Sequence, residues 1–287
     1  MRLPSRPRHA GNPTRAALAG LDDASLRVGM TRKSHNRDGT MTTVSIHLMG
    51  GLANQMFQYA AGLSLARHLG VELVLNTSSF ASAAPDRGYQ LDIFDVPEQL
   101  DPQPWRHGWI TKRMARSLPG RTLMVQAART GLGTLVYREP HHHFDPAFFR
   151  LEAPCAVRGY FHSPRYFATI EPDIRSRFET WPGWSERAAQ WATTISETPN
   201  AVAVHVRGGD YRSQTGSAPL RALEPAYYRR GLQLVESLIQ TETPQLFVFT
   251  DDPEHARDVL PQAPSWTLVE TPPERPWEDL RLMSMCD

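Results

Sequence analysis

Apolar and polar positions alternate between two periods along the chain from Val44 onward. Short β-branched runs are followed by longer segments in which apolar residues recur every three or four positions, which predicts alternating strands and helices. The expected strands are 44–48, 71–75, 157–161, 201–206, 246–250 and 266–270, and the expected helices are 53–69, 189–195, 225–240, 254–260 and 277–286. Residues 98–135 are expected to form irregular helices. The pattern therefore predicts an α/β protein with parallel sheets.

Two separate series of strands and helices are expected, joined by an irregular stretch. In the first, a Gly-Gly turn joins the first strand to a helix that Gly70 ends, and the next strand follows at once, which is typical of a parallel βαβ unit. The second series begins after Trp181. We therefore predict two Rossmann-like domains that face each other across a cleft, residues 41–190 and residues 191–287.

The first 40 residues differ from the rest in composition. They are rich in Arg, Pro and Gly and carry eight basic and three acidic side chains, whereas the remaining residues carry 23 and 27. A segment with so little apolar surface does not offset its ordering entropy, so residues 1–40 are predicted to be a disordered basic tail. Met41 or Met30 is then the expected natural start, and a basic anchoring arm is the functional alternative.

Bulk composition narrows the function classes. The chain has 287 residues, 40% of them hydrophobic, and a formal net charge of +1, so no nucleic-acid partner is expected. Cys155 and Cys286 are its two cysteines, too few for a disulfide framework, which favours a reducing, cytoplasmic location. No apolar run approaches the roughly 20 residues that span a bilayer, and residues 1–40 lack the apolar core of a signal peptide.

The segment AVAVHVRGGDY, residues 201–211, is the sharpest candidate site. An apolar strand ends in His205 and Arg207, followed by two glycines and Asp210. Because ligands of open α/β sheets bind beyond the carboxyl ends of the strands, the planar fork of Arg207 is placed to bind a pyrophosphate with two hydrogen bonds. Asp210 would orient Arg207 or cap the next turn. The plainer interpretation is a strand-to-loop corner with a surface ion pair.

Two further corners carry polar residues at strand ends. GGLANQ, residues 50–55, is similar to a phosphate-binding turn before a helix, but it lacks the third glycine of the dinucleotide fingerprint and the Lys of a P-loop. Asn54 and Gln55, in the first helical turn, are expected to face a cleft. Asp251 and Asp252 end a later strand, where one is expected to cap the next helix and the other to contact a guanine. The plainer interpretation is that both aspartates act as helix caps.

Other groupings of residues favour structural roles. His141, His142 and His143 are followed by Asp145, but adjacent histidines cannot all face one ion, so no metal site is predicted. The Arg-rich stretch 112–138 is expected to be a solvated face. The sequence has no supported Ser-His-Asp or Cys-His pattern for nucleophilic catalysis.

Taken together, these segments resemble those of glycosyltransferase family 11, which includes the bacterial α-1,2-fucosyltransferases. That family begins with GG-x-x-NQ followed by a hydrophobic residue and Q-Y-A, here GGLANQMFQYA, and carries H-x-R-R-x-D-Y in mid-chain, here HVRGGDY. YFHSPRYF, EPAYYRRGL, FTDDPE and EDLRLMSMC also occur in family order. The resemblance runs from Val44 to the last residue.

The resemblance implies a GT-B architecture in which the second domain holds most of the nucleotide sugar. It implies inverting, metal-independent transfer of fucose from GDP-fucose to the 2-hydroxyl of a galactoside, without a cofactor. Arg207 would bind the pyrophosphate and stabilise the charge on the departing GDP. Asp252 or Asp251 would contact the guanine, and Asn54 would reach the donor phosphates across the cleft. The donor-binding residues are then Arg207, Asp252, Asp251, Asn54, Gly51 and Asp210, with His205 beside Arg207 in the catalytic pocket.

Two departures from the family pattern are visible. Gly208 stands where the family has a second Arg, which removes one cation from the donor site. The chain ends at Asp287, before the strand and the Ser- and Trp-bearing loop that the family carries next, so the second domain is predicted to be truncated and turnover to be poor. An inactive fragment or pseudoenzyme and a fucosyltransferase with a different acceptor are the alternatives. No motif identifies the general base.

Overall fold

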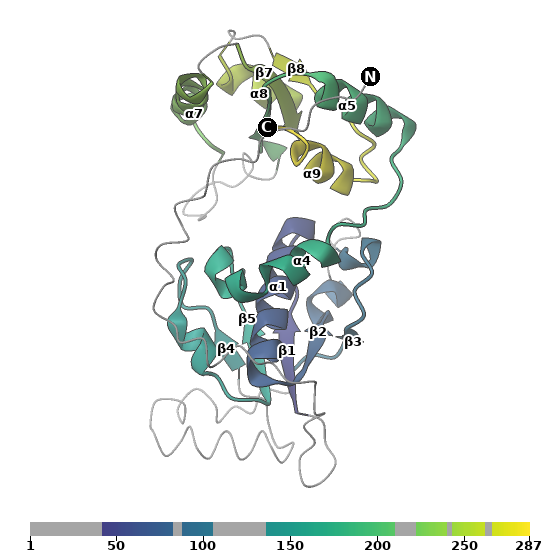
Figure 1. Cartoon of the computed structure of the whole chain (residues 1–287), viewed down its shortest axis with the longest axis vertical. Helices are drawn as coiled ribbons and strands as arrows, with labels where there is room; N and C mark the ends of the chain where they lie inside the picture. The colour runs from purple at the N-terminus through teal and green to yellow at the C-terminus, as the bar shows by residue number, and fades with distance from the viewer. Residues whose placement is uncertain (1–41, 83–87, 106–135, 210–221, 240–242, 262–265) are drawn as a thin grey trace, which may run out of the picture. The chain divides into compact units, whose positions relative to one another are not determined.

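The computed structural model describes residues 42–82, 88–105, 136–209, 222–239, 243–261 and 266–287. The chain divides into two compact units, each with its own parallel sheet (Figure 1). Unit 1 comprises the described residues up to Gln90 together with Pro97–Ile174, and unit 2 comprises Leu91–Val96 and Arg175–Asp287. The predicted α/β class with parallel sheets is confirmed.

The sheet of unit 1 has the strand order β3-β2-β1-β5-β4, with every pair of neighbours parallel. Its strands are β1 (Thr43–His47), β2 (Glu72–Asn76), β3 (Gln99–Asp101), β4 (Val136–Arg138) and β5 (Cys155–Arg158). The predicted strands at 44–48 and 71–75 are confirmed. Residues 99–101 form a strand instead of the expected helix, and β4 was not predicted, because three residues are too few to show a periodicity. The strand expected at 157–161 ends earlier, since residues 159–161 leave the sheet.

Helix α1 (Leu52–Leu69) joins β1 to β2 and packs against both strands (Figure 1). Gly70 ends the helix in the left-handed region at φ +66°, as the sequence predicts. A Cβ at Gly62 would lie 3.0 Å from side-chain atoms of Ile46 and Leu73, so this glycine allows the close approach of helix and sheet.

Short elements surround the unit 1 sheet. They are η3 (Ser78–Ser82), η6 (Pro146–Arg150), η7 (Pro164–Tyr166), η8 (Ala168–Ile170) and α4 (Glu171–Arg177), the last of which crosses the boundary to unit 2. Phe148, Phe161 and Tyr166 are completely buried and pack ring against ring beyond the end of β5. This aromatic cluster fixes the chain that follows β5.

Unit 2 is a three-layer arrangement around the sheet β6-β7-β8. Its elements are β6 (Ala201–Val206), β7 (Gln245–Thr250), β8 (Trp266–Leu268), η5 (Leu91–Ile93), α5 (Glu186–Glu197), α7 (Pro225–Leu238), α8 (Pro253–Val259) and α9 (Trp277–Met283). Side chains alternate along β7, so Phe247 and Phe249 pack with α5 and α9, whereas Val248 packs with α7 and α8. Both faces of the sheet are therefore covered. The strands and helices predicted for this half are all present, with small shifts at their ends.

The boundary between the units lies closer to the N-terminus than the predicted residue 190. Glu278, completely buried on α9, accepts hydrogen bonds from both N–H and Oγ of Ser185 at 2.7 Å. Trp277 also stacks on Trp184 with ring centroids 6.2 Å apart. These contacts fasten the segment before α5 to the C-terminal helix, so the helix predicted at 189–195 belongs entirely to unit 2.

Some predictions fall outside the described residues. These are the basic tail at 1–40, the Arg-rich stretch up to residue 135 and Asp210. Over the ranges that the structure describes, no helix combines the length and apolar character that a membrane span requires. The cytoplasmic location stays a prediction.

Candidate functional site

The first cluster of predicted site residues lies where β6 and β7 end. Val206 is the parallel partner of Thr250, so the residues that follow the two strands share one edge of the sheet. Arg207 Nη1 lies 2.8 Å from Asp251 Oδ2, and Gly208 N–H donates to Oδ1 of the same carboxylate at 2.9 Å. The Arg207 side chain remains 43% exposed. The carboxylate of Asp251 thus anchors the guanidinium while part of it stays accessible.

The two aspartates at this corner have different roles. Asp252 caps α8 because its Oδ1 accepts a hydrogen bond from His255 N–H at 2.9 Å. Asp251 is not a second cap, since its oxygens are occupied by Arg207 and Gly208. Among the described residues it is Asp251 that orients Arg207, the role that the sequence suggested for Asp210. The guanine contact of these aspartates stays a prediction.

Gly208 has a steric reason to be glycine in this fold. It is buried, and a Cβ there would lie 2.6 Å from the Cβ of Asp252 and 3.0 Å from His255 Cδ2. Asp252 is the N-cap of α8, so its Cβ cannot yield as the end of a flexible side chain would. The helix cap therefore occupies the space that any side chain at position 208 would enter, including the Arg of the family pattern.

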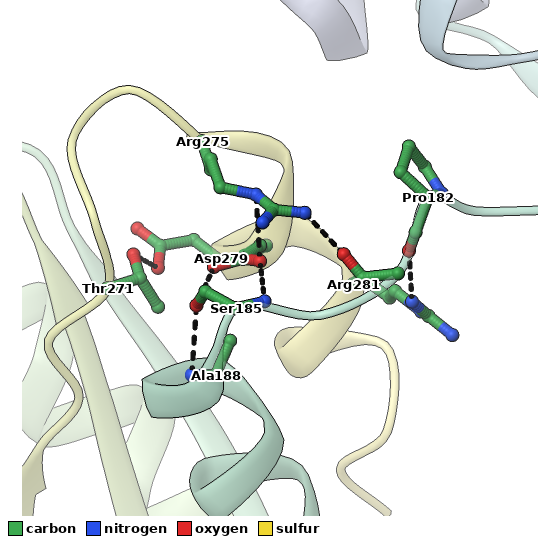
Figure 2. Close-up of polar contacts among 9 residues, drawn as sticks. Pro182, Ser185, Ala188, Thr271, Arg275, Asp279 and Arg281 are labelled. Atoms are coloured by element: carbon green, nitrogen blue, oxygen red, sulfur yellow. Dashed lines mark hydrogen bonds and ion pairs between the residues drawn. The ribbon is translucent and has the colours of Figure 1, made fainter.

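Asp279 on α9 is a charged neighbour of His205 that the sequence analysis did not single out. Its Oδ1 accepts a hydrogen bond of 2.6 Å from Thr271 Oγ1 (Figure 2). Loss of hydration raises the pKa of Asp279 above 3.8 and the charge of Glu278 raises it further, while the Thr271 hydrogen bond and His205 oppose the shift. The only signal in the sequence is its place in the segment EDLRLMSMC.

His205 lies on the face of β6 that α9 covers, because Ala201 and Ala203 of the same strand pack there. Its side chain reaches solvent, yet neighbouring atoms displace part of its hydration. This desolvation lowers the pKa of His205 below 6.5, and the charge of Arg207 lowers it further, against the opposing charges of Asp251 and Asp279. Near neutral pH the ring is therefore uncharged and adds no cation to the corner.

The second cluster lies in unit 1 at the turn between β1 and α1. Gly50 adopts φ +77°, where glycine is favoured, whereas Gly51 is the helix N-cap at φ −76° and a Cβ there would meet nothing. The amide Nδ2 of Asn54 lies over Gly50, 2.6 Å from the position that a Cβ would take. Its Oδ1 lies 2.9 Å from Nε2 of His162, which the sequence analysis did not single out. Contacts of Gly51 and Asn54 with donor phosphates stay predictions.

The expectation that Gln55 faces a cleft is wrong. Its side chain is completely buried, and Nε2 donates to the carbonyl oxygens of Gly50 at 2.9 Å and Gly88 at 3.0 Å. Gln58 is also completely buried and bonds both N–H and C=O of Met49, at 2.9 and 3.1 Å. At Met49 and Gly50 the backbone leaves the sheet, and the two glutamine side chains supply the hydrogen-bond partners that water would otherwise provide. They hold the glycine turn in shape.

The histidine run does not form a metal site with its neighbours. Asp145 caps η6 by accepting from Ala147 N–H at 2.9 Å and also accepts from Tyr137 Oη at 2.8 Å. Within the described ranges, no three His, Cys, Asp or Glu residues are arranged to hold a metal ion. The independence from cofactors stays a prediction.

No family model matches the chain. The chain is similar to an α-1,2-colitosyltransferase of Escherichia coli, with 23% identity over 216 residues that cover 75% of this chain and 70% of the relative. This relative is named for the transfer of a sugar, which agrees with the predicted resemblance to glycosyltransferases. The α-1,2 type stays a prediction for this chain.

Two solved structures are also similar. Fucosyltransferase NodZ from Bradyrhizobium has a TM-score of 0.44 and 14% identity, with 85% of this chain and 86% of NodZ covered. Arabidopsis thaliana FUT1, a mutant in complex with GDP, has a TM-score of 0.42 and 12% identity, with 89% of this chain and 66% of FUT1 covered.

Proposed function

We propose that this chain is a glycosyltransferase that takes GDP-fucose as donor and transfers fucose to the 2-hydroxyl of a galactoside. The corner at the carboxyl ends of β6 and β7 carries this proposal, because it presents a braced, accessible guanidinium where open α/β sheets bind their ligands. The relative from E. coli supports it, since that protein is named for an α-1,2 sugar transfer. The galactoside acceptor rests on the motif resemblance.

Arg207 has the main chemical role in the proposed reaction. As the acceptor oxygen bonds to C1 of fucose, the bond from C1 to the β-phosphate oxygen breaks, and its electron pair leaves with GDP. In an inverting, metal-independent transfer, the positive charge that stabilises this leaving group has to come from the protein. Arg207 supplies it from a fixed position, because Asp251 and the backbone of Gly208 set the orientation in advance.

Calorimetric titration of GDP tests the binding half of the proposal. We expect Arg207→Ala to weaken GDP binding about 10- to 100-fold, as the loss of a charge-assisted hydrogen bond predicts. Arg187→Ala is the matched control, because Arg187 forms an exposed surface ion pair with Glu270 in the same unit and should not affect GDP. Equal affinities in the wild type and Arg207→Ala would remove Arg207 from the site.

A direct assay tests the transfer half. Wild-type protein with GDP-fucose and lactose should form a fucosylated product in which fucose is linked to the 2-hydroxyl of galactose. A parallel reaction with GDP-colitose is informative, because the E. coli relative is named for colitose. Binding of GDP without transfer to any of a panel of galactosides would instead favour a protein that binds nucleotide sugars without activity.

A further inference from the structure

A hollow of about 630 Å³ lies on unit 2, between the first turns of α5 and the loop that follows β8. Small-molecule sites have volumes of about 300–1,000 Å³. The residues that line the hollow are Ser185, Glu186, Arg187, Gln190, Trp191 and Pro272. The end of α5 leads directly into the start of β6, so the first turns of α5 and the loop after β8 share the carboxyl edge of the sheet. Ligands of open α/β sheets bind at this edge.

The walls of the hollow are fixed before any ligand binds. Glu270 holds two of them, because its carbonyl oxygen accepts a hydrogen bond from Trp191 Nε1 at 3.2 Å and its carboxylate pairs with Arg187. On the side of the loop, Arg275 N–H donates to the carbonyl oxygen of Pro272 at 3.0 Å, which closes the loop in a turn. A ligand therefore does not have to order the side chains that it contacts, which favours binding.

The hollow combines an aromatic surface with two polar side chains. Trp191 packs against the core on the α5 side of the sheet but is only half-buried, so part of its ring lines the hollow. Glu186 and Gln190 are exposed one turn apart on α5, and within the described ranges neither side chain forms a hydrogen bond or ion pair. The carboxylate accepts hydrogen bonds, and the amide both donates and accepts. A sugar ring matches these groups, because its C–H groups form an apolar face and its hydroxyls donate and accept around the rim.

The charges around the hollow favour a neutral ligand. Arg187 is paired with Glu270, so these two charges offset each other, and the carboxylate of Glu186 adds a negative charge at the rim. Phosphates and carboxylates are repelled by such a site. The corner at Arg207 differs, since it presents an accessible guanidinium. The two places in unit 2 therefore suit ligands of different chemistry.

We propose that this hollow is a binding site for a neutral saccharide, separate from the nucleotide corner at Arg207. A sugar ring lies against Trp191, and its hydroxyls form hydrogen bonds with Glu186 and Gln190. The site holds a glycan on the protein and takes no part in a bond-making step. The proposal goes beyond the proposed transfer reaction and does not depend on it, because every residue of the hollow belongs to unit 2.

NMR titration of the full chain with lactose, N-acetyllactosamine and maltotetraose tests the site. We expect at least one of these saccharides to bind. Gln190→Ala should weaken this binding about 2- to 10-fold through the loss of a hydrogen bond, and Trp191→Ala should weaken it about 30-fold or more through the loss of an aromatic anchor. Gln233→Ala is the matched control, because Gln233 is also an exposed helical glutamine of unit 2 but lies on α7, which covers the opposite face of the sheet.

Trp191 also packs against the core, so Gln190→Ala keeps the test decisive if Trp191→Ala lowers Tm. Failure of all three saccharides to bind the wild type would overturn the proposal, and so would equal binding by the wild type and Gln190→Ala. A hyaluronan tetrasaccharide, which is anionic, should bind more weakly than the neutral saccharides, and tighter binding would contradict the charge argument.

GDP titrations separate this site from the nucleotide corner. Gln190→Ala and Trp191→Ala should keep the GDP affinity of the wild type, and a loss of affinity in Gln190→Ala would show that the hollow is part of the nucleotide site, against the proposal. The two proposals fail in different ways. A wild type that binds a neutral saccharide through Gln190 but neither binds GDP nor transfers fucose would refute the proposed function and support the saccharide site.

Discussion

The resembling family carries an arginine where this chain has Gly208. Replacement of Gly208 tests whether glycine stands there merely as a loss of one charge or because the packing leaves no room for a side chain. A Cβ at this position would lie 2.6 Å from the Cβ of Asp252 and 2.9 Å from its Oδ2, although atoms in ordinary contact are separated by more than 3.4 Å. Asp252 would have to move, and with it the cap of α8. Inserting an atom into such a site costs about 1–3 kcal/mol, which for a protein of this size lowers Tm by about 2–12 °C.

Gly231→Ala is the matched control for Gly208→Ala. Gly231 lies inside α7 in unit 2, and a Cβ there would meet nothing within 4 Å. Alanine should therefore raise stability by about 0.5–1 kcal/mol through helix propensity alone. Thermal unfolding of the two variants should thus shift in opposite directions from the wild type.

Gly208→Arg extends the same test to function. If the family arginine were merely absent, restoring it would strengthen GDP binding. We expect weaker binding than in the wild type, because the displaced Asp252 disturbs the neighbouring Asp251 that orients Arg207. A Gly208→Ala protein with the Tm and GDP affinity of the wild type would refute the steric reasoning, and so would a gain in affinity in Gly208→Arg.

Two further predictions concern residues that brace the clusters. Gln58→Ala should lower the free energy of unfolding by about 2–4 kcal/mol, since it leaves both backbone groups of Met49 without a partner, whereas Gln103→Ala on the surface should change it little in urea unfolding. Asp279→Asn should be more stable than the wild type near neutral pH. The raised pKa means that the native state binds this proton more tightly than the unfolded state, so ionisation costs stability as pH rises through that pKa. The advantage should disappear as pH falls below 3.8, where Asp279 is protonated in both the native and the unfolded state, and a Tm difference that stays constant across this range would contradict it.

The long periodic elements of this fold could be predicted from the sequence, whereas two three-residue strands of unit 1 could not. Helix α1 and strands β1, β2, β6 and β7 carry enough apolar positions for a period to be visible. Strands β3 and β4 have three residues each, and only their neighbours in the sheet make them strands. The segment Leu91–Val96 packs with unit 2 although the sequence around it belongs to unit 1, and no local pattern signals such a return.

The candidate sites were predictable where they follow a long strand. Arg207 and Asp251 come directly after β6 and β7, so the pairing of these parallel strands brings them together. Gln55 was misjudged because an amide in a first helical turn looks exposed, and only the structure shows that the loop at Gly88 covers it. Asp279 and His162 depend on contacts between segments distant in sequence, so their chemistry was invisible before the fold was known.

The charge balance around β6 explains why lysine should not replace Arg207. Asp251 is paired with Arg207, and His205 is uncharged near neutral pH, so the histidine adds no second cation to this corner. In the proposed site, a donor phosphate would share Arg207 with Asp251. The guanidinium has five N–H donors in a planar fork, so one edge can stay on Asp251 while another binds an anion. A lysine ammonium is a single point of charge that Asp251 would largely neutralise. Arg207→Lys should therefore bind GDP almost as weakly as Arg207→Ala.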